Sequence, residues 1–171
     1  MGIADTELSA AERRLGDWLG KGWHGEMDYM ARHGALRARP AELVPGTERV
    51  ICCRMDYLPE ADEAVEDPLL AAVARYARGR DYHKLMRVRL QRLCDRIEAE
   101  VGPFGHRAFA DSAPVMEVEL AARAGIGWRG KHTLLLDREG SWFFIGEILC
   151  DLKLKTDSPA KERCGTCEAC Q

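Results

Sequence analysis

Val50-Ile51-Cys52-Cys53 is a continuous apolar run of strand length that follows the turn residues Pro45-Gly46. A run with no alternating polar residues is typical of a strand that is buried on both faces of a sheet. Further along, the segment from Tyr82 to Val101 repeats apolar residues at spacings of three and four, which is the pattern of an amphipathic helix. The sequence therefore predicts a buried sheet with a long helix packed against it.

Shorter elements surround this centre. Arg107 to Ala110 is a second expected strand, and Thr133–Leu136 with Trp142–Ile145, joined by residues 137–141, predict a β-hairpin. Helices are expected from Ser9 to Leu19 behind a capping box, from Glu26 to Arg32, from Asp67-Pro68 onward, and from Ser112 and Pro114 to the glycines at 125 and 127. Strands alternating with helices predict an α/β or α+β domain, and the hairpin favours a mixed sheet.

Composition places the chain among ordinary globular proteins. It has 171 residues, of which 46% are apolar and 31% charged, and a net charge of −3. No apolar stretch has the length of a membrane helix, and the N-terminus lacks the order of a signal peptide, so a cytoplasmic protein is expected. We expect one domain over residues 1–155 and a linker with a metal-binding motif over residues 156–171.

The strongest chemical signal is the run Cys164-Gly165-Thr166-Cys167-Glu168-Ala169-Cys170, with cysteines at CxxCxxC spacing. This spacing opens the bacterial iron–sulfur motif C-x2-C-x2-C-x3-C-P. Its fourth cysteine and proline are not in the sequence, so we expect a truncated ferredoxin-like motif. A zinc knuckle is the rival interpretation, although zinc ligands usually come as two separated pairs. The remaining cysteines lie in apolar contexts and are expected to be small buried side chains: Cys52, Cys53, Cys94 and Cys150.

Asp111 is the candidate general acid, because it lies where a predicted strand gives way to a predicted helix. Burial in a crevice at such a junction can raise the pKa of a carboxyl group until it holds a proton near neutral pH. The alternative is that Asp111 is only the N-cap of the following helix.

Two further features suggest ligands. Residues 125–132 place three glycines around a tryptophan and two basic groups, which suggests backbone close to a ligand, although glycine-rich turns are common. The long helix is basic on its non-core positions, through Arg80, Lys84, Arg87, Arg89, Arg92 and Arg96. Such a stripe can bind phosphates, or it can be a solvated face paired with nearby acids.

Seven motifs, taken together and in order, resemble the epoxyqueuosine reductase family of cobalamin-dependent iron–sulfur enzymes. They are Trp23-His24-Gly25-Glu26-Met27-Asp28-Tyr29-Met30, Leu43-Val44-Pro45-Gly46, Arg75-Tyr76-Ala77-Arg78-Gly79-Arg80-Asp81-Tyr82-His83-Lys84, Asp111-Ser112-Ala113-Pro114, Gly125-Ile126-Gly127-Trp128-Arg129-Gly130-Lys131-His132, Ser141-Trp142-Phe143-Phe144-Ile145-Gly146-Glu147 and the cysteine run. Reductive dehalogenases are similar in plan, as cobalamin enzymes with ferredoxin-like clusters, but do not share the third and fourth motifs together.

The resemblance implies a cobalamin-binding α/β domain that leads into a ferredoxin-like domain with two [4Fe–4S] clusters. In the family the clusters pass electrons to cobalamin, which acts on the epoxide of epoxyqueuosine at the wobble position of tRNA and yields queuosine. Family members are longer at both ends and carry a helical-repeat tail that helps to hold tRNA. The fragment alone is therefore expected to be inactive. A monomer, tRNA as partner and an unidentified electron donor are the expected setting.

Residue by residue, Asp111 matches the family's proton donor. Residues matching cobalamin contacts or lining the pocket are Arg37, Ala74, Asp111, Leu135, Tyr82, His83 and Lys131. Residues matching three ligands of one cluster are Cys164, Cys167 and Cys170.

The competing function class is a ferredoxin-like electron carrier or a zinc-stabilised binding module without catalysis of its own. A simple carrier needs little beyond its cysteine runs, whereas a long chain precedes Cys164. This excess favours an enzyme domain.

Overall fold

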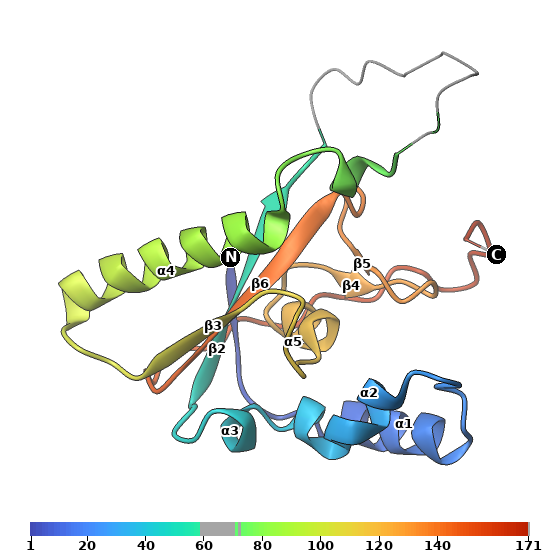
Figure 1. Ribbon diagram of the computed structural model, residues 1–171, viewed down its shortest axis with the longest axis horizontal. Coiled ribbons are helices and arrows are strands. Elements are labelled where there is room, and N and C mark those ends of the chain that lie inside the picture. Colours follow the sequence, from blue (N-terminus) through green and yellow to red (C-terminus); the bar gives the residue numbers. More distant parts are fainter. Residues whose placement is uncertain (59–70, 72, 171) are drawn as a thin grey trace.

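A computed structural model describes residues 1–58, 71 and 73–170. Its centre is a four-stranded sheet in the order β1-β2-β6-β3 (Figure 1). The strands are β1 (Gly2–Ala4), β2 (Arg49–Asp56), β3 (His106–Phe109) and β6 (Phe143–Cys150). All three strand pairs of this sheet are antiparallel. The prediction of a domain that combines helices with a sheet is confirmed, and the fold is of the α+β class. The expected mixture of parallel and antiparallel strands is wrong, because this sheet is antiparallel throughout.

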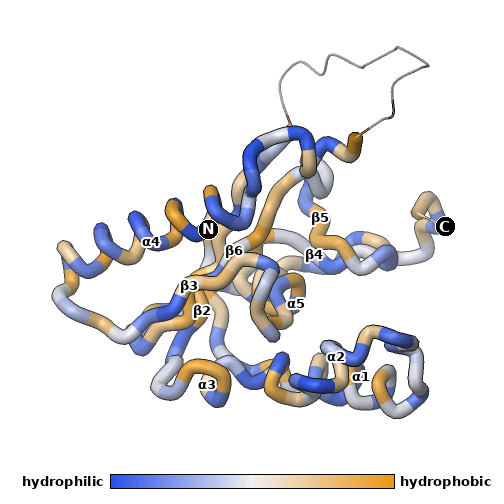
Figure 2. The backbone as a smooth tube through the Cα atoms, in the orientation of Figure 1, coloured by the Kyte–Doolittle hydropathy of each residue, from blue (hydrophilic) through white to orange (hydrophobic). Residues whose placement is uncertain are grey.

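Helix α4 (Tyr82–Val101) covers one face of this sheet and has the bounds that its periodicity predicts. Its buried side chains Met86, Leu90 and Cys94 pack with Ile51 and Ile148 of the sheet. Figure 2 shows hydrophobic and hydrophilic residues alternating along this helix, as expected for one apolar stripe on an otherwise solvated surface.

Helix α5 (Glu117–Arg123) packs on the opposite face. Leu120 and Ala121 of this helix are fully buried in one core cluster with Val50, Cys52 and Leu149 of the sheet. Alternate residues of β2 thus face the two different cores, which explains why its run Val50–Cys53 is continuously apolar. The prediction of a strand buried on both faces is confirmed.

The N-terminal region forms a helical lobe beside α5. It consists of α1 (Ser9–Gly20), α2 (Asp28–His33), the 3-10 helix η1 (Gly34–Ala38) and α3 (Pro40–Leu43). The helices expected at Ser9–Leu19 and Glu26–Arg32 correspond to α1 and α2, but the prediction that Ser9 caps α1 is wrong. Leu8 is the N-cap without a side-chain bond, and the Ser9 amide donates instead to the carboxylate of Glu7, 2.9 Å away.

The expected hairpin is wrong. β5 (Leu135–Leu136) pairs with β4 (Trp128–Arg129) in a separate two-stranded sheet, whereas β6 pairs with β2 and β3. Both edges of β6 are already occupied by neighbours, so no ladder position remains for the segment before it.

The helix expected from Ser112 begins five residues later, at Glu117. Asp111 has a positive φ of 61°, and local bonds from Ser112 and Val115 to the carbonyls two residues earlier make tight turns there. The ring of Pro114 also disfavours helical backbone at Ala113. The helix expected at Asp67-Pro68 lies outside the described residues. After them the chain forms η2 (Arg75–Ala77) and enters α4.

Residues 151–163 have no regular secondary structure, and hydrogen bonds hold them against the domain. Asp157 exchanges two hydrogen bonds with Ile3 of β1, and the Ala160 amide donates to the Ala122 carbonyl of α5. In the described part of the chain, every helix is too short or too polar to cross a membrane.

Candidate active site

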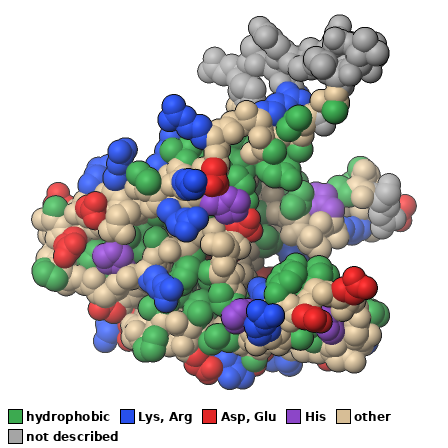
Figure 3. Space-filling model, in the orientation of Figure 1, with side chains coloured by type: hydrophobic (Ala, Val, Ile, Leu, Met, Phe, Trp, Pro, Cys, Tyr) green, Lys and Arg blue, Asp and Glu red, His purple; other side chains and the backbone are tan. Residues whose placement is uncertain are grey.

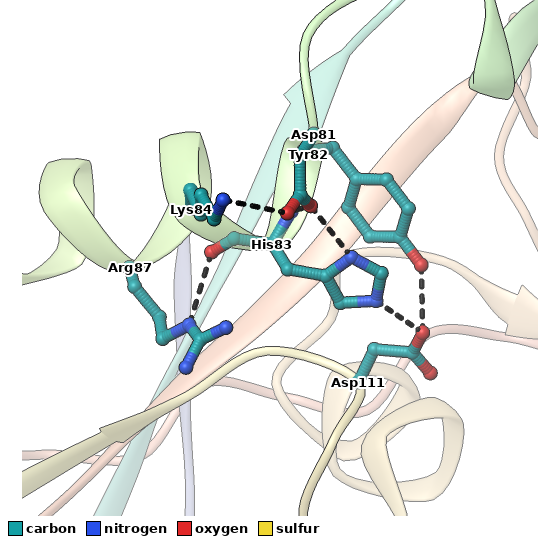
Figure 4. A network of polar contacts seen from close by, with 6 residues as sticks. All are labelled: Asp81, Tyr82, His83, Lys84, Arg87 and Asp111. Atoms are coloured by element: carbon teal, nitrogen blue, oxygen red, sulfur yellow. Dashed lines mark hydrogen bonds and ion pairs between the residues drawn. The ribbon is translucent and has the colours of Figure 1, made fainter.

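Asp111 lies just beyond the C-terminal end of β3, and its carboxylate points to the first turn of α4 (Figure 4). Its Oδ2 accepts a hydrogen bond from the Tyr82 hydroxyl at 2.7 Å and contacts His83 Nε2 at 2.9 Å. The N-cap alternative for Asp111 is wrong, because α5 begins after Met116 and the Asp111 carboxylate bonds to α4 instead.

The start of α4 orients both partners of Asp111. The side chain of Asp81, the N-cap, accepts from the His83 amide at 3.0 Å and contacts His83 Nδ1 at 2.9 Å. The Tyr82 ring stacks on Phe144 of β6, with ring centroids 4.0 Å apart. An N-cap and an aromatic stack therefore fix the two donors before any ligand binds.

The electrostatics of this network differ from the expectation of a buried, protonated Asp111. More than half of its side chain surface is exposed, and hydrogen bonds from Tyr82 and then His83 lower the pKa of the carboxyl group. The same contact with Asp111, and then the one with Asp81, raises the pKa of His83. The network thus favours an ionised Asp111 and a protonated His83, because donors stabilise the charged form of an acid and carboxylates that of an imidazole.

A second pair of carboxyl groups lies behind Asp111. The Asp111 amide donates to Glu117 Oε1 at 2.6 Å. Glu147 of β6 is fully buried, and neither of its oxygens has a conventional hydrogen-bond partner among the described residues. Burial raises the pKa of Glu117 to about 7 and that of Glu147 well above its ordinary value. Sequence reasoning assigned no role to this pair, although a glutamate within the apolar strand Phe143–Cys150 is an available signal.

Two cavities adjoin these elements. A groove of about 520 Å³ runs between α1 and α5, with the Trp18, Met30 and Met116 side chains in its wall and Arg37 beside them. Arg37 donates through Nη2 to the Tyr29 carbonyl at 3.0 Å, while its buried Nε has no partner among the described residues. This groove can therefore receive a group that is partly apolar and carries a hydrogen-bond acceptor.

The second cavity, of about 380 Å³, lies beside Tyr82 at the start of α4. Arginines and aromatic rings contribute to its lining: Arg75, Arg78, Arg80, Arg89, Tyr57, Tyr76, Tyr82 and Phe144. Guanidinium groups together with aromatic faces suit a ligand that has both phosphates and flat rings.

The other candidate residues lie apart from the Asp111 network. Ala74 is the exposed N-cap of η2, and Leu135 is buried in β5 with 3% of its surface exposed. Lys131 donates through Nζ to the carbonyl of Cys167, 2.8 Å away, and so joins the glycine-rich segment to the cysteine run. The structure thus brings together Tyr82, His83 and Asp111 of the predicted set and leaves the others in separate places.

The cysteine run forms a turn in which the Cys167 amide donates to the Cys164 carbonyl at 2.9 Å. Gly165 has a positive φ of 46°, which glycine adopts without strain. Cys164 is half-buried, whereas Cys167 and Cys170 are exposed. Across the described residues, no three potential metal ligands are gathered around one point. Among the other cysteines, Cys53 is half-buried and the rest are buried, in line with their apolar contexts.

Comparisons with known proteins agree with one another. The family described as "Epoxyqueuosine reductase QueG, DUF1730" matches residues 37–112. The epoxyqueuosine reductase of Alicycliphilus denitrificans is 60% identical over 99% of this chain and 50% of its own length. The structure of epoxyqueuosine reductase from Streptococcus thermophilus superposes with a TM-score of 0.82 at 23% identity, covering 99% of this chain and 46% of that one.

An epoxyqueuosine reductase solved with an epoxyqueuosine-modified tRNA-Tyr stem loop has a TM-score of 0.80 at 20% identity, over 99% of this chain and 46% of that one. The chain thus spans about half the length of the curated relatives and solved structures that it matches.

Proposed function

We propose that this chain, which is homologous to the epoxyqueuosine reductases over 99% of its length, carries the active site at which such an enzyme reduces epoxyqueuosine to queuosine in tRNA. The observation that carries the proposal is the exposed carboxylate of Asp111, held by His83 and by Tyr82, which also lines a basic, aromatic cavity. That a related enzyme was solved with a modified tRNA stem loop supports tRNA as the substrate.

Opening an epoxide leaves negative charge on the departing oxygen, so the reaction needs a general acid close to it. In our proposal Asp111 is that acid, and His83 supplies its proton. The imidazolium holds the proton at Nε2, 2.9 Å from Asp111 Oδ2, and can pass it to the carboxylate as substrate charge develops. A low pKa for Asp111 in the free protein is compatible with this role, because the proton is stored on the adjacent ring.

The residues of the groove between α1 and α5 fit cobalamin. Its corrin presents a broad apolar surface with many amide oxygens, and the partnerless Nε of Arg37 is a donor suited to one of them. When bound, cobalamin would supply the electrons that reduce the substrate. We further propose that Ala74, Lys131 and the backbone at Leu135, which lie outside this groove, also contact cobalamin or line its pocket.

Cys164, Cys167 and Cys170 are proposed to ligate one of two [4Fe–4S] clusters in the complete enzyme. The spacing is that of the bacterial iron–sulfur motif, and the turn at Gly165 lets thiolates two residues apart converge. An electron donor, which the reduction requires, is a further partner in this proposal.

Helix α4 is proposed as part of the tRNA surface. Lys and Arg side chains are prominent on the face of the molecule that Figure 3 shows. Arg89, Arg92 and Arg96 are exposed and have no carboxylate within ion-pairing distance among the described residues, which favours phosphate binding over a self-neutralised face. The domain's net charge of −3 means that this stripe supplies only part of the affinity.

The test is conversion of an epoxyqueuosine-containing tRNA stem loop by the complete enzyme and by its Asp111→Asn variant. We expect activity in the former and a loss of roughly 10²- to 10⁴-fold in the latter, because the amide cannot donate the required proton. Asp17→Asn, at an exposed position on α1, is the matched control and should keep full activity.

Two other results would overturn the proposal. Electron transfer without any conversion of the stem loop would indicate a ferredoxin-like carrier. Removal of halide from an organohalide, with the stem loop left unchanged, would indicate an enzyme of the dehalogenase kind.

A further inference from the structure

The proposed reaction assigns no step to Glu117, which is half-buried, or to Glu147, which is fully buried. Glu147 lies opposite Cys52 of β2 and Phe109 of β3 in the sheet register, so its side chain points from β6 toward α5. There it neighbours the Glu117 carboxyl group, and each of the two groups shifts the pKa of the other. Two ionised carboxylates can only accept hydrogen bonds, so a bond between these groups requires a proton on one of them.

The surroundings favour Glu147 as the proton holder. It is fully buried, and the neighbouring titratable groups are the thiols of Cys52 and Cys53, the carboxyl groups of Glu117 and Asp111, and His83 beyond them. Desolvation, followed by the charge of Glu117, raises the pKa of Glu147. The hydrogen bond with Glu147 acts on Glu117 in the opposite direction, favouring its ionised form. A neutral Glu147 hydroxyl that donates to Glu117 satisfies both groups.

Glu117 in turn holds the backbone that carries Asp111. Its Oε1 accepts the Asp111 amide at 2.6 Å. Asp111 is one of only two non-glycine residues with positive φ in the described chain, a conformation that is unfavourable for an L-residue. A strained residue keeps such a conformation only when surrounding bonds fix it.

We propose that Glu117 is a positioning residue for the catalytic turn, and that Glu147 keeps it in place by donating a carboxyl proton to it. Bonds from Glu147 to Glu117 and from Glu117 to the Asp111 amide then set where the Asp111 carboxylate meets Tyr82 and His83. The importance of these hydrogen bonds for turnover rests on the proposed role of Asp111. Whether the bonds exist can be tested without measuring turnover.

The first experiment measures hydrogen exchange of the Asp111 amide by NMR in the 171-residue protein at pH 7. Glu117→Ala removes the acceptor and should lower the protection factor of this amide at least tenfold. Glu117→Gln keeps an acceptor oxygen and should retain most of the protection. Glu98→Gln on the exposed side of α4 is the control. Equal protection of Asp111 in Glu117→Ala and the wild type would overturn the positioning role, whatever the activity of the enzyme.

The second experiment locates the proton. The glutamate side chains are labelled with ¹³C, and the carboxyl signal that disappears in Glu147→Gln is assigned to Glu147. We expect this signal to remain that of a protonated acid at pH 7, whereas a glutamate with the ordinary pKa of 4.5 is ionised at that pH. A Glu147 signal that titrates with the ordinary ones would overturn the proposed proton. Should Glu147→Gln fail to fold, Glu147→Asp serves for the assignment.

Discussion

Replacing Glu117 by glutamine should change how the stability of the fold depends on pH. In the unfolded chain the Glu117 carboxyl group has its ordinary pKa of 4.5, whereas burial raises the pKa in the folded protein to about 7. Between these values the folded state retains on Glu117 a proton, in addition to the proton of Glu147, that the unfolded state has released. The contribution of the Glu117 proton to the free energy of unfolding is therefore fully present below pH 4.5 and is lost as the pH rises toward 7.

The size of this loss follows from the same two values. At about 1.36 kcal/mol per pH unit, a pKa raised from 4.5 to about 7 corresponds to about 3 kcal/mol. The amide of Glu117→Gln is neutral at every pH, so the variant lacks this decline. Its free energy of unfolding, relative to that of the wild type, should rise by about 3 kcal/mol between pH 4.5 and pH 7.

Urea unfolding followed by circular dichroism, at closely spaced pH values from 4.5 to 8, measures the difference. Glu98→Gln, on the exposed side of α4, should follow the wild-type curve throughout. Parallel pH curves for Glu117→Gln and the wild type would refute the reasoning, since they would mean that Glu117 titrates alike in the folded and unfolded states.

Three further predictions concern other parts of the molecule. His83→Gln should move the alkaline limit of turnover to lower pH, because the raised pKa of His83 keeps the proton available as the pH rises; an unchanged pH profile would count against His83 as proton source. Leu90→Ala should destabilise the fold by about 2–5 kcal/mol in urea unfolding, since Leu90 is buried between α4 and the sheet, while Val88→Ala on the exposed side should change stability by less than about 0.5 kcal/mol. Reversing the charges of Arg87 and Arg92 together should weaken binding of the tRNA stem loop and flatten its salt dependence; the same slope as the wild type would mean that this face of α4 is only solvated.

The elements that could be predicted from local sequence are those whose own pattern of apolar residues determines their structure. Helix α4 repeats its apolar residues over 20 residues, and β2 contains the continuous apolar run Val50–Cys53, so both appear where expected. The failed hairpin shows the limit of local pattern. The segment at Leu135 and Phe143 has the composition of paired strands, yet β6 has two partners from distant parts of the chain. Strand pairing depends on which segments compete for the edges of β6, and the sequence of one short segment does not contain that information.

The candidate site divides in the same way. The position of Asp111 after a strand was predictable, but its ionisation was not, because the groups that set it are contributed by α4, 28 and 29 residues earlier in the chain. The carboxyl pair was harder still. Each glutamate taken alone resembles a surface residue, and only the packing of α5 on β6 turns the two into a buried pair that must hold a proton.

The two sets of titrating groups around Asp111 act on different parts of the residue. Tyr82 and His83 contact its carboxylate on the cavity side, where they set its charge and can renew its proton. Glu117 contacts its amide on the core side and fixes the backbone in a conformation that is otherwise unfavourable. Because the contact with Asp111 is the first cause of the raised pKa of His83, a change at Glu147 that moves Asp111 should also lower the pKa of His83. A general acid held in this way can change its protonation state during a reaction while the turn that carries it stays in place.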